Sequence, residues 1–147
     1  MTNVMYVDLV DSESRLFAGD AEYLVANAYD GEIGIYPNHV ALITKLKPGV
    51  LRIKLPDKEE QSVFAISGGF LEVCSNRVTV LADIIERTEA LDEARLVEQK
   101  EDALNKLNRS DSTMSYDLAK VQASLDIAIA QLKALDFLKK RSRQING

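Results

Sequence analysis

The residue types that most often carry catalysis or bind metals are scarce in this chain. Its 147 residues include one histidine, His39, and one cysteine, Cys74. A zinc site needs several Cys or His ligands, and a Ser-His-Asp triad would have to use that single histidine. Cys74 ends the apolar segment 70–74, where we expect a small core residue rather than a nucleophile. These counts disfavour a metal centre and a nucleophilic hydrolase.

Glycine-rich phosphate-binding motifs are also missing from the sequence. It contains neither a G-x-x-x-x-G-K-[ST] loop nor a G-x-G-x-x-G fingerprint. The pieces at 31–34 and 68–69 are too short to surround a phosphate, so we interpret them as turns and bulges of a β structure. The sequence therefore predicts a protein that is not an enzyme, and a small enzyme stays the weakest alternative for want of a site.

The distribution of glycine and proline divides the chain into two parts. All three prolines lie before residue 70, and so do all the glycines except the last residue, Gly147. These residues mark turns and break helices. The chain therefore predicts a turn-rich β part followed by an uninterrupted helical part.

Charge and hydropathy narrow the class of partner. The net charge is -5, and acidic residues outnumber basic ones over residues 1–90, which disfavours nucleic-acid binding. No run approaches the roughly 18 apolar residues that a membrane-spanning helix needs. The last part of the chain is basic instead, and its cations are Lys133, Lys139, Lys140, Arg141 and Arg143. They suit the negative end of a helix dipole, or alternatively a partner-binding surface.

Residues 1–87 alternate short apolar segments with turn signals. Asp30-Gly31 is a hairpin signal, and segment 49–55 alternates apolar with basic residues. About eight to ten strands at this spacing predict an antiparallel β-sandwich or a flattened barrel. After Arg87 the hydrophobic period becomes helical, with Asp92 as a cap and a loop at 108–112. The fold class is therefore α+β, a sandwich over 1–87 followed by an antiparallel two-helix hairpin over 88–147.

The second helix has apolar residues on two faces, and the rear face is rich in alanine. Alanine is the best helix former and is harmless on a surface, so this face needs no partner. Alternatively the rear face makes a second contact, on the β domain or on another protein. The rear-face residues are Ala119, Ala123, Ile127, Ala130, Ala134 and Phe137. Because a two-helix hairpin has a thin core, we expect docking worth a few kcal/mol, which suits a conformational switch.

Four segments in order resemble the epsilon subunit of bacterial F-type ATP synthases. They are GEIGIYPNH at 31–39, LKPG at 46–49, SGGFLEV at 67–73 and VTVLAD at 78–83. Segment 86–92 resembles the junction between the two domains of that family. The resemblance covers essentially the whole chain, although Val40-Ala41 stands where the family usually has a proline.

The resemblance implies a non-catalytic rotor subunit of the central stalk. Such a subunit binds gamma, rests on the c-subunit ring and couples the proton-driven ring to gamma during ATP synthesis. Its mobile helices extend into the alpha/beta head and inhibit ATP hydrolysis. It would lie on the cytoplasmic face of the bacterial inner membrane, associate with the membrane only through the complex, and bind no nucleic acid.

The resemblance also implies roles for individual residues. Glu32 and His39 match positions that face the ring and gamma, and the basic residues from Lys133 to Arg143 would meet an acidic loop of the beta subunits. Some epsilon subunits bind regulatory ATP, and Asp92 and Arg95 match that motif, with a leucine in place of its final alanine. No other cofactor is expected. A stand-alone ATP-sensing or adaptor module, with a β-sandwich and a helical tail, remains the alternative.

Overall fold

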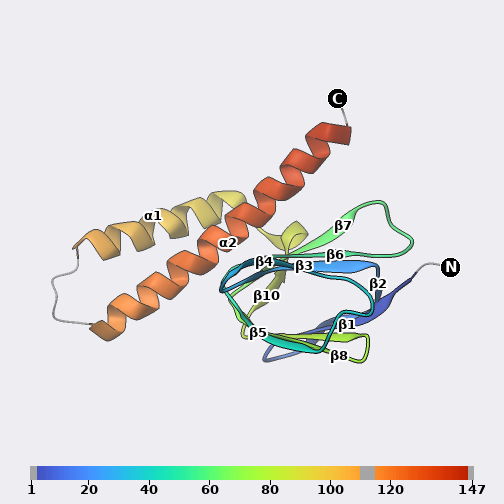
Figure 1. Ribbon diagram of the computed structural model, residues 1–147. Coiled ribbons are helices and arrows are strands. Elements are labelled where there is room, and N and C mark those ends of the chain that lie inside the picture. The colour runs from blue at the N-terminus through green and yellow to red at the C-terminus, as the bar shows by residue number, and fades with distance from the viewer. Residues whose placement is uncertain (1–2, 110–114, 146–147) are drawn as a thin grey trace.

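The computed structural model describes residues 3–109 and 115–145, apart from the side chains at 115–117 and 145. A β part comes first along the chain and a helical part second, as predicted (Figure 1). The strands are β1 (Met5–Val10), β2 (Arg15–Ala21), β3 (Tyr23–Ala28), β4 (Gly31–Ile35), β5 (Leu42–Leu46), β6 (Gly49–Lys54), β7 (Gln61–Ile66), β8 (Gly69–Cys74), β9 (Arg77–Ala82) and β10 (Ile85–Arg87). The helical elements are η1 (Thr88–Ala90), α1 (Glu93–Arg109) and α2 (Ser115–Ile145).

The strands form one ten-stranded sheet that folds over on itself. Their order is β10-β7-β6-β3-β5-β8-β9-β1-β2, and β4 pairs with β3. One layer contains β6 and β7 and the other contains β5 and β8 (Figure 1). Between the layers lies a core of fully buried side chains, among them Met5, Leu24, Leu51, Phe64 and Leu71. The predicted sandwich is confirmed.

One strand pair departs from the antiparallel expectation. β1 runs parallel to β9, with Tyr6 opposite Arg77 and Val10 opposite Leu81. Parallel neighbours cannot be joined by a tight turn, so this pair comes from two distant parts of the chain. It joins the β1–β2 hairpin to the rest of the sheet beside β9.

Two turns depend on residues with unusual backbone freedom. Gly31 has φ 125° at the start of β4, directly after the turn from β3, as the Asp30-Gly31 hairpin signal predicts. Gly69 has φ 147°, and a Cβ there would collide with the carbonyl oxygen of Leu81. The bulge interpretation of the Gly68-Gly69 pair therefore has a steric cause.

The turn between β1 and β2 is held by a carboxylate. Asp11 Oδ1 accepts hydrogen bonds from the backbone N–H of Glu13 at 2.9 Å and of Ser14 at 2.7 Å. These bonds, first from Glu13 and then from Ser14, hold the pKa of Asp11 below its usual range because they favour the charged form. The turn is an Asx type, in which the side chain substitutes for a backbone acceptor.

The prediction that Cys74 is a core residue is wrong. Strand β8 alternates, so Leu71 and Val73 point into the core while Phe70 and Cys74 are exposed on the outer face. The period of two in a strand places Cys74 on the same side as Phe70, whatever the hydropathy of its neighbours.

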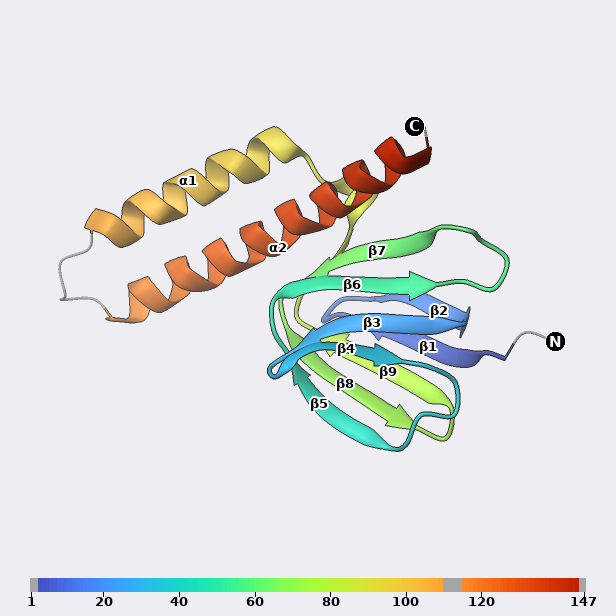
Figure 2. The same ribbon diagram turned by 45° about the horizontal axis from the view of Figure 1, so that its top comes forward.

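The helices form the predicted hairpin, and α2 lies against the β domain (Figure 2). α1 packs along α2, while α2 also contacts β6, β7 and η1. Asn108 and Arg109, predicted in the loop, continue α1 instead, where a cation in the last turn suits the helix dipole. The rest of that loop, 110–112, lies outside the described residues.

Candidate functional site

The surface of interest is the docking face, which we define as the contact of α2 with β6, β7 and the junction at 86–91. Its centre is a small apolar cluster, separate from the sandwich core. Val63, Ala65 and Ala134 are buried there, and partly buried apolar side chains surround them. Those surrounding side chains are Val50, Leu91, Phe137 and Leu138. β7 is therefore covered on both faces, by the core on one side and by α2 on the other.

This cluster decides between the two interpretations of the alanine-rich rear face. Ala130 and Ala134 are buried at 2% and 0% exposure, so the second contact exists and it lies on the β domain. Ala119 and Ala123, nearer the start of α2, are exposed. Small side chains allow the helix backbone to approach the sheet closely only over the second half of α2.

Polar contacts surround the apolar centre. Gln131 is buried, and its Nε2 donates to Glu86 Oε2 at 2.5 Å. Thr88 is fully buried, and its hydroxyl donates to the carbonyl oxygen of Val63 at 2.8 Å, which fixes the junction against β7. Neither Gln131 on α2 nor Glu86 on β10 was predicted as a site residue, because a single polar residue in a helix or a short strand gives no pattern.

Arg52 is a further contact that sequence reasoning missed. Its guanidinium carbon lies 4.9 Å from the ring centre of Phe137 on α2, a cation–π distance. Its Nη2 lies 3.0 Å from Glu32 Oε1 on β4. Arg52 lies on the outward face of β6, whose residues alternate between buried and partly exposed. It becomes an interface residue because α2 packs over that face and brings Phe137 to it.

The predicted cations at the end of α2 have different roles in this structure. Arg141 binds the turn before β7, since its Nη2 lies 2.9 Å from Glu60 Oε2 and its Nη1 donates to the carbonyl oxygen of Gln61 at 2.7 Å. Lys139 pairs with Glu93 at the start of α1. The other three cations have different surroundings: Lys140 pairs with Asp136 within α2, Arg143 is exposed in the last turn, and Lys133 lines a cavity.

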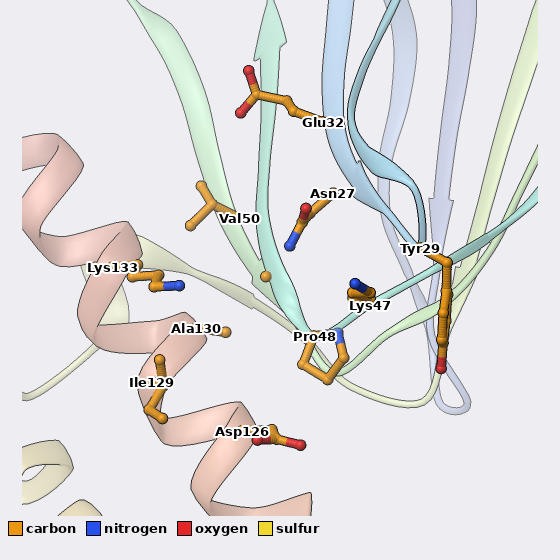
Figure 3. A pocket seen from close by; sticks show the side chains of 11 residues that line it. Asn27, Tyr29, Glu32, Lys47, Pro48, Val50, Asp126, Ile129, Ala130 and Lys133 are labelled. Carbon is orange, nitrogen blue, oxygen red and sulfur yellow. The ribbon is translucent and has the colours of Figure 1, made fainter.

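That cavity, of about 600 Å³, separates α2 from the end of the sheet (Figure 3). From the sheet side it is lined by Asn27, Tyr29, Glu32 and the turn between β5 and β6. From α2 it is lined by Asp126, Ile129, Ala130 and Lys133. The docking face is therefore tight at Ala134 and open beside Lys133.

The structure does not bring Glu32 and His39 together. Glu32 is the second residue of β4 and pairs with Arg52, while His39 lies in the loop beyond the other end of β4. His39 is half-buried, and its Nδ1 lies 2.8 Å from the carbonyl oxygen of Val40. The loop is fastened by Asn76, whose Oδ1 accepts from the backbone N–H of Asn38 at 3.0 Å. The two positions therefore lie at opposite ends of β4.

Asp92 and Arg95 do line a common cavity. It measures about 500 Å³ and lies between the junction and both helices, with Glu86, Gln99 and Gln131 also in its wall. Asp92 caps α1 as predicted, since its Oδ1 accepts from the backbone N–H of Ala94 at 3.1 Å and of Arg95 at 3.4 Å. Leu96, which departs from the ATP motif, is buried and lines the same cavity.

The fold places this chain in the class of two-domain proteins in which a helical hairpin docks on a β-sandwich. The family model described as the beta-sandwich domain of the ATP synthase delta/epsilon chain matches residues 4–88, which end at the junction. Among solved structures, a chain in the Euglena gracilis mitochondrial ATP synthase, described as OSCP/F1/c-ring in rotational state 1, superposes with a TM-score of 0.80. The identity is 20%, over 90% of this chain and 82% of that one, so this likeness concerns the fold.

Curated relatives cover nearly the whole length of the chain. The ATP synthase epsilon chain of Chromobacterium violaceum is 50% identical over 138 residues, which are 94% of this chain and 97% of that one. The epsilon chain of Nitrosospira multiformis is 47% identical over 138 residues, with the same coverage. The chain therefore belongs to the family of ATP synthase epsilon chains. Neither described helix combines the length and the apolar character that crossing a bilayer requires.

Proposed function

We propose that this chain is a non-catalytic rotor subunit of an F-type ATP synthase, in which the β domain couples the proton-driven c-ring to gamma and the hairpin inhibits ATP hydrolysis after release from the β domain. The observation that carries the proposal is the docking face itself. The hairpin is held by an apolar cluster of three buried residues and a few polar contacts, apart from the sandwich core. Such a contact can open while the β domain stays folded.

The outer face of the sheet supports a protein partner for the β domain. Phe70 and Leu81 lie opposite each other on β8 and β9 and are 53% and 50% exposed, and Ile43 on β5 is 74% exposed. Adjacent large apolar side chains on an open sheet face favour a protein interface over water. In this proposal gamma covers that face, the ring contacts the β domain near Glu32, and the complex lies on the cytoplasmic face of the bacterial inner membrane.

The inhibitory part of the proposal assigns a second partner to the end of α2. After release, Lys133, Lys139, Lys140, Arg141 and Arg143 meet an acidic loop of the beta subunits. A cationic helix end and an acidic loop attract each other, and an extended helix obstructs rotation sterically. Glu32 and His39 stay with the ring and gamma in both states.

Deletion of residues 92–147 tests the two parts separately. In reconstituted ATP synthase heads we expect higher ATP hydrolysis with the shortened chain than with the full chain, and unchanged co-purification with gamma. Equal hydrolysis by the two assemblies would remove the inhibitory part and keep the coupling part. Failure of the full chain to co-purify with gamma would instead favour the stand-alone adaptor.

The cavity beside Asp92 and Arg95 favours regulatory ATP binding as a second candidate function. A nucleotide there would contact the junction and both helices at once, and would therefore favour the docked state. We expect heat on titration of the full chain with Mg-ATP and a loss of that heat in Arg95→Gln. No heat at millimolar nucleotide would exclude this function without affecting the rotor proposal.

A further inference from the structure

The turn between β6 and β7 is acidic and contacts the end of α2. Residues 55–60 read LPDKEE, which is three carboxylates and one ammonium group. The neighbouring Lys54 is balanced by Glu22 on β3, with which its Nζ pairs at 3.5 Å, and it also donates to the backbone carbonyls of Leu55 and Lys58. The turn therefore presents negative charge toward the end of α2.

Arg141 occupies this turn with two different contacts. One guanidinium nitrogen lies 2.9 Å from Glu60 Oε2 and another donates to the carbonyl oxygen of Gln61 at 2.7 Å. The planar fork of an arginine can satisfy two acceptors at once, which an ammonium group does with less geometric specificity. The Arg141 side chain is 26% exposed, so it is partly withdrawn from water on docking.

The other cations near this turn are less closely tied to it. Lys140 lines a cavity of about 410 Å³ there, together with Glu59 and Gln61, but its Nζ pairs with Asp136 one helical turn back, at 2.8 Å. Lys139 points to α1 and pairs with Glu93. Arg141 is thus the cation of this cluster whose ion pair crosses to the β domain.

We propose that the β6–β7 turn is an internal acidic receptor for the end of α2, which competes with an acidic protein segment of a partner for Arg141. The proposal rests on the proposed function for the identity of that partner surface. One guanidinium cannot bind Glu60 and an acidic loop elsewhere at the same time. In the docked chain the Arg141 guanidinium is bound to Glu60, and only in the released chain is it available to the partner's acidic segment.

This competition gives the two members of one ion pair opposite roles. Removal of the Glu60 charge weakens docking and leaves Arg141 available, so inhibition of hydrolysis should increase. Removal of the Arg141 charge weakens docking and also removes a contact to the partner, so inhibition should not increase. A purely structural ion pair would give the same direction for both changes.

The first measurement uses the isolated full-length chain and follows hydrogen exchange of α2 amides over residues 135–145. The pair is partly exposed, so we expect exchange about 2- to 5-fold faster in Glu60→Gln than in the unmodified chain. Glu13→Gln, an exposed carboxylate in the turn between β1 and β2 and outside the docking face, is the control and should leave exchange unchanged. Raising the salt concentration should speed exchange in the unmodified chain more than in Glu60→Gln, because screening acts on the intact pair.

The second measurement uses ATP hydrolysis by assembled heads that carry each variant. We expect stronger inhibition with Glu60→Gln, the unmodified level with Glu13→Gln, and no increase with Arg141→Gln. The exchanged pair, Glu60→Arg with Arg141→Glu, should restore slow exchange in the isolated chain and yet inhibit less.

Two results would overturn the proposal. Exchange in Glu60→Gln as slow as in the unmodified chain would show that the turn does not hold α2. A shift of inhibition in the same direction by Glu60→Gln and Arg141→Gln would show that no competition exists. Failure of the proposed function is distinguishable, because then deletion of the hairpin itself leaves hydrolysis unchanged, whatever the exchange data show for the turn.

Discussion

Ala134 is the position where the docking face can be tested most directly. Its side chain is fully buried between α2 and β7, in contact with the cluster that contains Val63 and Ala65. Ala134→Leu adds three carbon atoms at a position where the Ala134 side chain is already completely enclosed by its neighbours. Overpacking of this kind costs about 1–3 kcal/mol. The helix can avoid the clash by leaving β7, so the cost should fall on the docking equilibrium and not on the sandwich core.

The magnitude follows from the free energy. About 1.4 kcal/mol corresponds to a factor of ten, so undocking should become about 5- to 150-fold more frequent. Hydrogen exchange of α2 amides, read by mass spectrometry, measures this change. Amides of β1 and β9 are the internal reference and should keep their protection, because those strands belong to the separate core.

Ala123→Leu is the matched control, since Ala123 lies on the same helix and is exposed. It should leave exchange of α2 unchanged. Unaltered α2 protection in Ala134→Leu would refute the assigned docking face. An equal loss of protection in α2 and in β1 would show instead that hairpin and sandwich unfold as one unit, and the separate opening on which the proposed inhibition depends would be lost.

Three further outcomes follow from the β domain. Gly69→Ala should lower the free energy of unfolding in urea by about 3 kcal/mol or more, because the strain of a positive φ and the collision with a carbonyl oxygen add together. Gly34→Ala is the control and should have little effect, because the nearest atom to its added Cβ is 3.6 Å away. Phe70→Ser combined with Leu81→Ser should weaken co-purification with gamma while the urea midpoint changes little, because both side chains are half exposed; retained binding would place gamma on another face. Asp11→Ala should lower stability at neutral pH, and the difference from the unmodified chain should vanish as the pH falls through the lowered pKa of Asp11, because a depressed carboxyl pKa stabilises only the charged form; a constant difference down to acidic pH would contradict the turn assignment.

The two-part fold could be predicted because its signals are local. The absence of glycine and proline after Gly69 until the last residue, and the periods of two and then 3.6, each depend on neighbouring residues only. The parallel pairing of β1 with β9 could not be predicted in the same way, because no local pattern links Tyr6 to Arg77. The error at Cys74 was avoidable, since strict alternation from Phe70 places it on the outer face.

The docking face was predictable only in part. The alanine-rich rear of α2 indicated that a second contact could exist, and helix geometry alone could not choose its partner. Arg52 and Glu60 gave no signal, because a charged residue is also the usual occupant of a solvent-exposed position in a strand or a turn. Their role arises from where α2 lies, which is a tertiary property. The motif at Asp92 and Arg95 marked a cavity in the structure, although its ligand stays a prediction.

The pairing of β1 with β9 also bears on how the chain acquires its fold during synthesis. The first strand leaves the ribosome long before the strand that completes its pairing, and contacts of such large sequence separation form slowly. Leu81, which pairs with Val10, is synthesised only a few residues before the junction to the hairpin. The two helices, whose contacts with each other are local, are therefore synthesised just after the β domain can complete its sheet. The face of β7 that α2 covers is then already formed when the hairpin docks.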